Sequence, residues 1–116
     1  MHAKNEIYAV RDGGKMTLYY DDQKSVRNGD AKWWEWDKDT KNLVTEAVFD
    51  ISFQTNDAKP TTTMNWFSYF SNMERIENLN YLNTEEVKDM YGMFSTCKQL
   101  KELDLSGFNT ANVWRM

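Results

Sequence analysis

Alternation of apolar and polar residues predicts β-strands in the first half of the chain. Residues 7–11 and 16–20 are β-prone runs on either side of the glycine turn Asp12-Gly13-Gly14, so we expect a β-hairpin. From Thr45 onward, apolar and polar side chains alternate, which is typical of a half-buried strand. The side chains predicted to face the interior are Ala47, Phe49, Ile51 and Phe53.

A tryptophan cluster lies between these two regions. Trp33, Trp34 and Trp36 are expected on a short strand or packed loop, where Trp34 and Trp36 would share one face. Aromatic faces stack on sugar rings, so the cluster could form a carbohydrate platform. The plainer interpretation is that it caps the apolar end of the fold.

The second half of the chain contains a repeated pattern. Residues 83–90 resemble residues 109–116 at an offset of 26. A fainter copy aligns residues 49–52 with residues 103–106, at an offset of twice 27. This period, together with Leu100, Leu103 and Leu105, is the signature of leucine-rich repeats. At an offset of 27, Phe67, Phe70, Met73 and Ile76 match Phe94, Cys97, Leu100 and Leu103.

A short helix is predicted in each unit after its strand. Asn83 or Thr84 would cap the helix, and the two glutamates that follow would favour its N-terminus. Apolar residues then recur at i, i+3, i+4 and i+7, so one face of the helix would point inward. This face consists of Val87, Met90, Tyr91 and Phe94.

Residues 82–110 (LNTEEVKDMYGMFSTCKQLKELDLSGFNT) resemble the repeat of the BspA-like family almost position by position. Residues 8–10 and 18–24 are similar to the hairpin that precedes such repeats in Bacteroidales proteins. The resemblance implies an α+β fold: a short leucine-rich-repeat solenoid, with a strand plus a short helix per repeat, and an N-terminal β-hairpin cap. Residues 1–44 would form the hairpin and Trp-rich cap, and residues 45–116 about three repeats, the last truncated. Trp114 and Asn78 depart from the family pattern.

The resemblance also implies a cell-surface or secreted protein that acts in adhesion or protein interaction, with no shared catalytic residues and no cofactor. We therefore expect a non-catalytic module whose partner is a host or bacterial surface protein. Residues 1–6 lack an apolar signal region, so we expect that an exported protein would carry its signal outside this chain. Two alternatives are a carbohydrate-binding module and a structural spacer. An open solenoid end exposes its core, so either a homodimer through the C-terminal end or a missing continuation of the array is implied.

The composition of the chain limits the classes of partner that we expect it to bind. The 14 basic residues are interspersed among 18 acidic ones, for a net charge of −4, so we expect no nucleic-acid binding. No apolar run is long enough for membrane insertion. Cys97 is the only cysteine and His2 the only histidine, so no zinc site is expected, and Cys97 is interpreted as a buried hydrophobe rather than a reactive thiol. Core roles are predicted for Met64, Met90, Met93 and Met116.

An acidic column is the most specific site hypothesis. The repeat places Asp50, Glu77 and Asp104 at one position of three successive strands, at offsets of 27. Neighbouring strands lie roughly 5 Å apart, and like charges in register repel, so such a column could bind a cation or a basic partner. The alternative is that these side chains simply solvate an exposed strand face.

Overall fold

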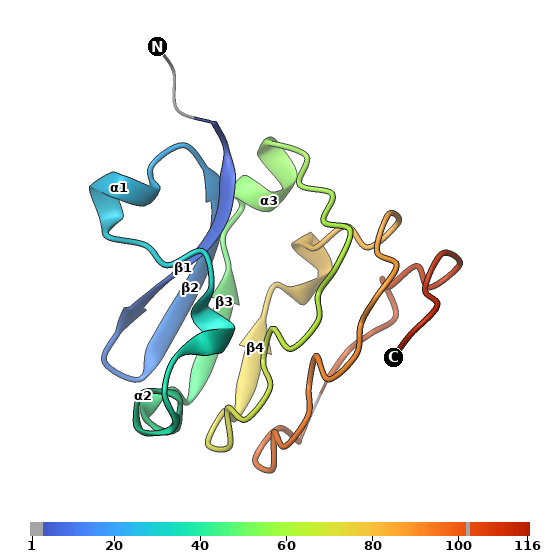
Figure 1. Cartoon of the computed structure of the whole chain (residues 1–116). Helices are drawn as coiled ribbons and strands as arrows, with labels where there is room; N and C mark the ends of the chain where they lie inside the picture. Colours follow the sequence, from blue (N-terminus) through green and yellow to red (C-terminus); the bar gives the residue numbers. More distant parts are fainter. Residues whose placement is uncertain (1–3, 102) are drawn as a thin grey trace.

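The chain forms an α+β fold around one mixed four-stranded sheet with the strand order β1-β2-β3-β4 (Figure 1). The computed structural model describes residues 4–101 and 103–116. Strands β1 (Glu6–Asp12) and β2 (Lys15–Asp21) pair antiparallel, whereas β3 (Glu46–Phe49) and β4 (Arg75–Glu77) add in parallel beyond β2. The hairpin thus forms one side of the sheet, and the two strands that follow residue 45 extend it.

The predicted hairpin is confirmed. Its turn needs a left-handed residue, and Gly13 supplies it at φ +60°. Alternation along β2 buries Met16 and Leu18 and leaves Thr17 between them partly exposed. The sequence pattern therefore corresponds directly to the two faces of this ribbon.

The strand predicted from Thr45 ends earlier than expected. Ala47 and Phe49 are buried on β3 as predicted, but the carboxylate of Asp50 then accepts a hydrogen bond from the N–H of Ser52 at 2.9 Å. This turn starts the helix α3 (Ser52–Thr55). The prediction for Ile51 is wrong, since its side chain is 48% exposed. Phe53 is buried, but from the helix and not from a strand.

The remaining regular elements are short helices on the cap and the linking segments. The tryptophan cluster forms a turn of 3₁₀-helix, so the predicted alternation of Trp33 and Trp34 across a strand is wrong. The next helix begins at Asp37, whose carboxylate accepts a hydrogen bond from the N–H of Thr40 at 2.7 Å and thereby has a lowered pKa. These helices are α1 (Lys24–Arg27), η1 (Trp33–Glu35), α2 (Lys38–Leu43) and η2 (Leu79–Tyr81).

Two irregular segments of the second half run side by side. We call residues 61–70 the first rung and residues 87–97 the second rung; they are yellow-green and orange in Figure 1. Backbone N–H groups of the first rung donate to carbonyls of the second rung at a constant offset along the sequence, over 2.8–3.0 Å. The donors are Thr63, Asn65, Phe67 and Tyr69, and the acceptors are Asp89, Tyr91, Met93 and Ser95.

The helix predicted after Asn83 is wrong. Carbonyls of Tyr91 and Met93 accept hydrogen bonds from the first rung, so the segment does not form a continuous i+4 ladder. Left-handed residues interrupt it as well, at Gly92 (φ 66°) and Thr96 (φ 61°). The chain instead makes successive i+3 turns, in which the N–H groups of Met93, Ser95 and Cys97 donate to the carbonyls three residues earlier.

Repeat-related residues share unusual backbone conformations. Asn65 and Gly92 are at equivalent positions of successive repeats and both left-handed, as are Tyr69 and Thr96. Because L side chains rarely adopt this conformation, its recurrence at the repeat spacing indicates that the two rungs have one backbone design.

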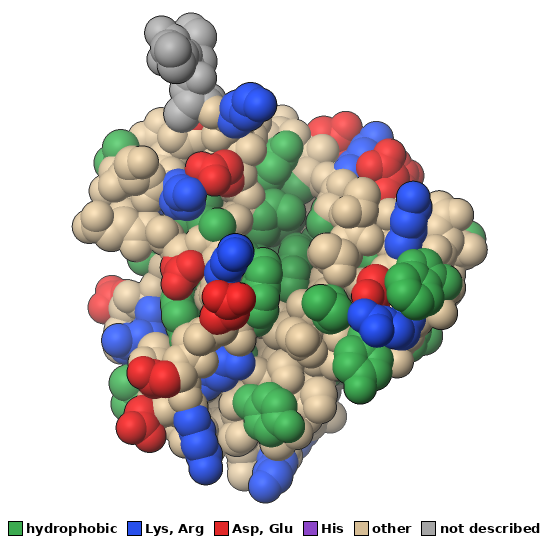
Figure 2. Space-filling model, in the orientation of Figure 1, with side chains coloured by type: hydrophobic (Ala, Val, Ile, Leu, Met, Phe, Trp, Pro, Cys, Tyr) green, Lys and Arg blue, Asp and Glu red, His purple; other side chains and the backbone are tan. Residues whose placement is uncertain are grey.

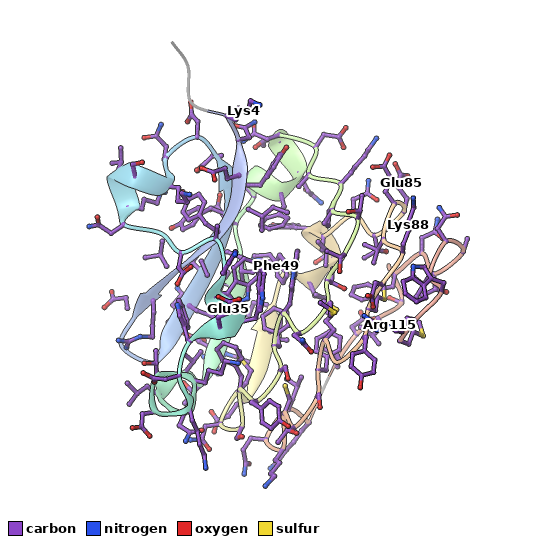
Figure 3. All side chains as sticks on the ribbon, viewed as in Figure 1. Lys4, Glu35, Phe49, Glu85, Lys88 and Arg115 are labelled. Atoms are coloured by element: carbon purple, nitrogen blue, oxygen red, sulfur yellow. The ribbon has the colours of Figure 1, made fainter. Side chains whose placement is uncertain are left out.

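An aromatic core joins the sheet to the rungs. Phe49 lies near the centre of the molecule (Figure 3) and meets the ring of Phe67 edge-on at 6.2 Å. Phe67 in turn stacks on Phe94, its equivalent in the next repeat, at 5.8 Å. The same cluster includes Ala9 and Trp33, so residues before and after position 45 share one core. Its other buried members include Met16, Leu18, Val44, Phe53, Trp66, Phe70, Met73, Leu79, Leu82 and Met93.

Gly92→Ala is expected to lower the free energy of unfolding. The left-handed conformation alone costs a residue with a Cβ about 1–2 kcal/mol, and the new Cβ would meet the side-chain oxygen of Asn65. Gly107→Ala is the matched control because no atom lies within 4 Å of its added Cβ. Urea denaturation of both variants tests this, and an equal loss in the two would contradict it.

Candidate interaction surface

Two side chains of the cap donate hydrogen bonds to carbonyls of the first rung. The indole N–H of Trp33, a fully buried side chain, donates to the carbonyl of Trp66 at 2.8 Å. The ammonium of Lys41 donates to the carbonyl of Ser68 at 2.9 Å. These carbonyls alternate with the N–H groups that reach the second rung, so the cap serves the opposite edge of the first rung.

Lys41 was not expected in the interior. It is 7% exposed, its ammonium lies 5.3 Å from the centre of the Phe70 ring, and no described carboxylate pairs with it. Burial lowers its pKa because the charged form loses its hydration. Lysine is rarely buried unless its charge is paired or hydrogen-bonded. Here the ammonium of Lys41 bonds the carbonyl of Ser68, to which a backbone N–H of a preceding rung would otherwise donate.

The tryptophan cluster therefore lies in the cap. Trp34 packs edge-on against Trp33 at 4.8 Å and is half-buried. The indole of Trp36 donates to the carboxylate of Asp30 at 2.7 Å. Only Trp34 and Trp36 of the cluster retain partial exposure, and Trp34 borders a hollow of about 270 Å³ beside Pro60.

The three acidic residues do not form a column. Strand β4 pairs with β3 in a register that sets Ile76 opposite Ala47, which places Glu77 opposite Val48 and not opposite Asp50. The carboxylate of Glu77 instead lies 3.4 Å from the guanidinium of Arg75. Asp104 accepts a hydrogen bond from the N–H of Ser106, and this bond lowers its pKa. No group of three potential metal-ligating side chains is present among the described residues.

An exposed patch that we call the aromatic patch lies on the side of the molecule where the chain ends. Trp114 is 69% exposed and Tyr91 is 52% exposed. The guanidinium of Arg115 lies 4.7 Å from the centre of the Tyr91 ring and 5.2 Å from that of Trp114. Figure 2 shows hydrophobic side chains gathered here around basic and acidic ones, and Figure 3 labels Arg115. The patch comprises Met64, Tyr91, Trp114, Arg115 and Met116.

Arg115 is held in place by a two-bond ion pair. Its Nη2 and Nε lie 2.6 and 3.2 Å from the two carboxylate oxygens of Asp89. This contact raises the pKa of Arg115 and lowers that of Asp89. The guanidinium of Arg115 thus contacts the carboxylate of Asp89 and lies close to both aromatic rings.

Sequence reasoning missed this patch. Met64 and Met116 were expected in the core, but their side chains are exposed, whereas Met90 and Met93 are buried as predicted. The sequence repeat does indicate the ion pair, because aligning residues 83–90 with residues 109–116 sets Asp89 against Arg115. Opposite charges at one repeat position are expected to pair when the units stack.

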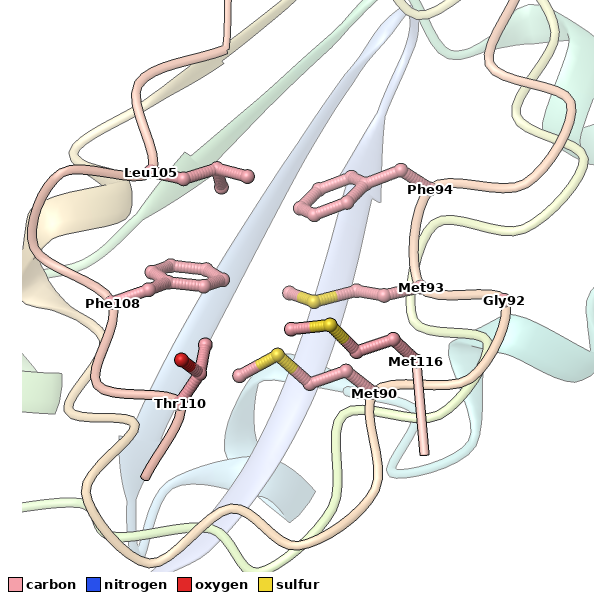
Figure 4. A pocket seen from close by; sticks show the side chains of 8 residues that line it. All are labelled: Met90, Gly92, Met93, Phe94, Leu105, Phe108, Thr110 and Met116. Atoms are coloured by element: carbon pink, nitrogen blue, oxygen red, sulfur yellow. The ribbon is translucent and has the colours of Figure 1, made fainter. Parts of the chain in front are cut away.

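An apolar hollow of about 490 Å³ borders the aromatic patch (Figure 4). Phe94 and Met93 of the second rung point into it from one side, and Leu105 and Phe108 face them from the other. We call it the end pocket. Its remaining lining residues are Met90, Gly92, Thr110 and Met116.

Cys97 is half-buried, and its thiol donates to the carbonyl of Phe67 at 3.0 Å. Burial raises the pKa of the thiol to about 11, and the charge of Lys41 opposes this rise only in part. The thiolate is thus disfavoured at neutral pH, as expected for a packing residue.

No protein-family model matches the chain, and neither a curated protein nor a solved structure is significantly similar to it. In the described part of the chain, no helix is long and apolar enough to cross a membrane. The side chains themselves therefore provide the basis for a functional proposal.

Trp33→Phe is expected to lower the free energy of unfolding by about 1–3 kcal/mol, because the buried carbonyl of Trp66 loses its donor. Trp34→Phe is the control, since the indole N–H of Trp34 has no acceptor among the described residues. Urea denaturation should show a clearly smaller loss for the control. Equal losses would mean that ring volume, and not the hydrogen bond, matters.

Alkylation of Cys97 by iodoacetamide should accelerate with a midpoint near pH 11 in the folded chain, because only the thiolate reacts and burial disfavours it. In urea the midpoint should fall toward the ordinary thiol value of about 8.5. Mass spectrometry of samples quenched across a pH series measures both midpoints. A folded midpoint at or below the unfolded one would be contrary to this account.

Proposed function

We propose that the chain is a non-catalytic protein-interaction module of a bacterial surface or secreted protein. The aromatic patch is the observation on which this proposal rests. Tryptophan, tyrosine and arginine are the residue types that dominate binding energy at protein interfaces. Here one of each is exposed and in contact, at Trp114, Tyr91 and Arg115.

Preorganisation supports the same proposal. A long arginine side chain normally loses rotamer freedom on binding, which weakens the complex. The ion pair with Asp89 already fixes Arg115, so little of that cost would remain when a partner binds. A fixed guanidinium can also recognise a carboxylate or carbonyl group of a partner protein.

Leucine-rich-type repeats similar to those of the BspA-like family are the architecture we propose for residues 45–116. Support comes from the backbone hydrogen bonds between rungs at the repeat spacing and from the paired left-handed positions. Function in such arrays comes from a surface of stacked units. Met64 and Tyr91, one repeat apart, lie at equivalent positions of that surface.

A non-catalytic role is supported by the state of the reactive groups. The thiol of Cys97 has a raised pKa, and the ammonium of Lys41 is bound to a carbonyl in the interior. His2 lies outside the described residues. Neither Cys97 nor Lys41 combines an exposed side chain with a pKa suited to nucleophilic catalysis.

Carbohydrate binding is the second candidate. Trp34 is partly exposed beside the 270 Å³ hollow, and Thr61 and Thr62 provide hydroxyl groups at its edge. A sugar ring stacked on this indole would depend on Trp34 and not on Trp114, so the two functions are separable by mutation.

Binding of the labelled chain to one array of purified extracellular and bacterial surface proteins and one array of glycans tests the proposal. We expect protein spots to bind, and Trp114→Ala to weaken that binding about 30-fold, the loss of a hot-spot side chain worth about 2 kcal/mol. Leu43→Ala, which removes an exposed side chain of helix α2, should bind like the original chain.

Two results would contradict the proposal. The first is binding to glycans alone with loss in Trp34→Ala, which would favour the second candidate. The second is binding to no arrayed protein, or protein binding that Trp114→Ala leaves unchanged.

A further inference from the structure

The turns that follow strands β3 and β4 lie at the same end of the sheet. Because the two strands are parallel, helix α3 and the 3₁₀ turn η2 both follow at the carboxyl ends of their strands; they are green and gold in Figure 1. Phe53 of α3 and Asn80 of η2 are equivalent at the repeat offset of 27, and Gly107, in the turn after residues 103–105, follows at the same offset. Three successive units therefore each present a turn here.

A hollow of about 350 Å³ lies among these turns, and we call it the inter-turn hollow. Phe53, Asn80 and Gly107 all line it, so described residues of three units form its walls. A smaller hollow of about 170 Å³ also has Asn80 and Gly107 in its lining, so the two adjoin. The inter-turn hollow is thus a feature of the stacked units themselves.

Side chains with unused hydrogen-bonding groups line the inter-turn hollow. The carboxamides of Gln54 and Asn80 and the phenol of Tyr81 make no hydrogen bond to another described residue. The side-chain oxygen of Asn83 accepts a hydrogen bond from the N–H of Glu85 at 3.0 Å, which leaves its amide nitrogen to donate. Since a carboxamide has two donors and an accepting oxygen, the hollow offers donors and acceptors together.

The backbone that carries these side chains is held by local hydrogen bonds. The N–H of Ala58 donates to the carbonyl of Phe53 at 3.0 Å and closes the end of α3. The side-chain amide of Asn78, which precedes η2, donates to the carbonyl of Phe49 at 3.4 Å and joins this turn to the end of β3. A ligand would therefore order side chains and not whole turns, which lowers the entropic cost of binding.

The charge around the hollow favours a neutral ligand. Asp57 is the only charged residue in its described lining. Lys59, whose ammonium lies 3.6 Å from this carboxylate, is also paired with Glu85 at 3.2 Å. An anionic ligand would be repelled by Asp57, and its attraction to Lys59 would compete with two carboxylates.

A neutral glycan matches these groups. Each sugar hydroxyl both donates and accepts, as carboxamides do, and the half-buried ring of Tyr81 offers an apolar face on which a sugar ring can stack. Phe53 and Leu82 form the apolar part of the lining. An extended peptide presents its donors and acceptors in a row, whereas the groups here come from the turns of different units.

We propose that the inter-turn hollow binds a neutral oligosaccharide. Gln54, Asn80 and Asn83 hydrogen-bond its hydroxyl groups, and Tyr81 packs against a sugar ring. This site shares no residue with the aromatic patch or with the hollow beside Trp34, so it goes beyond the proposed protein-interaction function.

The probes are the neutral trisaccharides maltotriose, cellotriose, mannotriose and tri-N-acetylchitotriose, titrated into the ¹⁵N-labelled chain. At least one of them should move the side-chain amide resonances of Gln54, Asn80 and Asn83 in a saturable way. The side-chain amides of Asn72 and Asn112 are internal controls, because they are already bonded to carbonyls and should not move. Trigalacturonate, which is anionic, and a short glycine-serine peptide should leave all five unchanged.

Gln54→Ala should weaken binding of that trisaccharide about tenfold, through the loss of hydrogen bonds. Gln99→Ala is the matched control, since Gln99 is exposed and lies outside the hollow. Gly107→Trp should abolish binding by filling the space that the two hollows share, whereas Gly107→Ala should retain it; no atom lies within 4 Å of a Cβ added at this glycine. Circular dichroism of the variants verifies that they fold.

Absence of saturable shifts with all the trisaccharides, equal affinity of Gln54→Ala and Gln99→Ala, or full binding by Gly107→Trp would overturn the inference. Equal shifts with trigalacturonate or with the peptide would overturn it in favour of an anion or a polypeptide, and loss of binding in Trp34→Ala would place the glycan in the other hollow. Trp114→Ala should bind the trisaccharide like the original chain. Failure here while the arrays still show protein binding dependent on Trp114 would refute this hollow alone.

Discussion

Backbone hydrogen bonds between the two rungs are the interaction on which the second half of the molecule depends. The rungs contain no regular helix and no extended strand, so their polar backbone groups cannot be satisfied within one segment. Four N–H groups of the first rung find acceptors on the second. This pairing fixes the register in which Phe67 stacks on Phe94 and in which Asp89 meets Arg115. The same ladder therefore determines both the packing of aromatic side chains in the core and the pairing of charged side chains on the surface.

The two outer edges of this ladder differ in the backbone groups that the ladder itself does not pair. At the first rung the unpaired groups are carbonyls, and the cap closes them with the indole of Trp33 and the ammonium of Lys41. Burying a lysine is costly because its charge loses water, and two contacts offset that cost: a charged donor bonds the carbonyl of Ser68, and the Phe70 ring lies beneath it. At the second rung the unpaired groups are donors, and an apolar pocket accompanies them. The first rung is therefore capped by Trp33 and Lys41, whereas no described residue accepts a hydrogen bond from the N–H groups of Gly92, Phe94 and Thr96.

Part of the architecture could be predicted from the sequence. The hairpin follows from alternation around a glycine turn, and the spacing of the sequence repeat matches the spacing of the hydrogen-bonded rungs. The helix predicted over Val87 to Phe94 failed because i, i+3, i+4 spacing cannot distinguish a helix from successive i+3 turns whose carbonyls bond another segment. The acidic column failed because strands β3 and β4 pair out of the repeat register, with Glu77 opposite Val48. Lys41 was missed because its acceptor belongs to a distant turn.

Amide hydrogen exchange of the free chain tests the ladder most directly. Asn65, Phe67 and Tyr69 should exchange slowly because their N–H groups are bonded to the second rung. Gly92, Phe94 and Thr96, at the same positions one unit later, should exchange at least tenfold faster, since no described residue accepts a hydrogen bond from their N–H groups. Equal protection of the two sets would contradict the account, because it would mean that the rungs do not pair in this register or that the N–H groups of the second set are hydrogen-bonded as well.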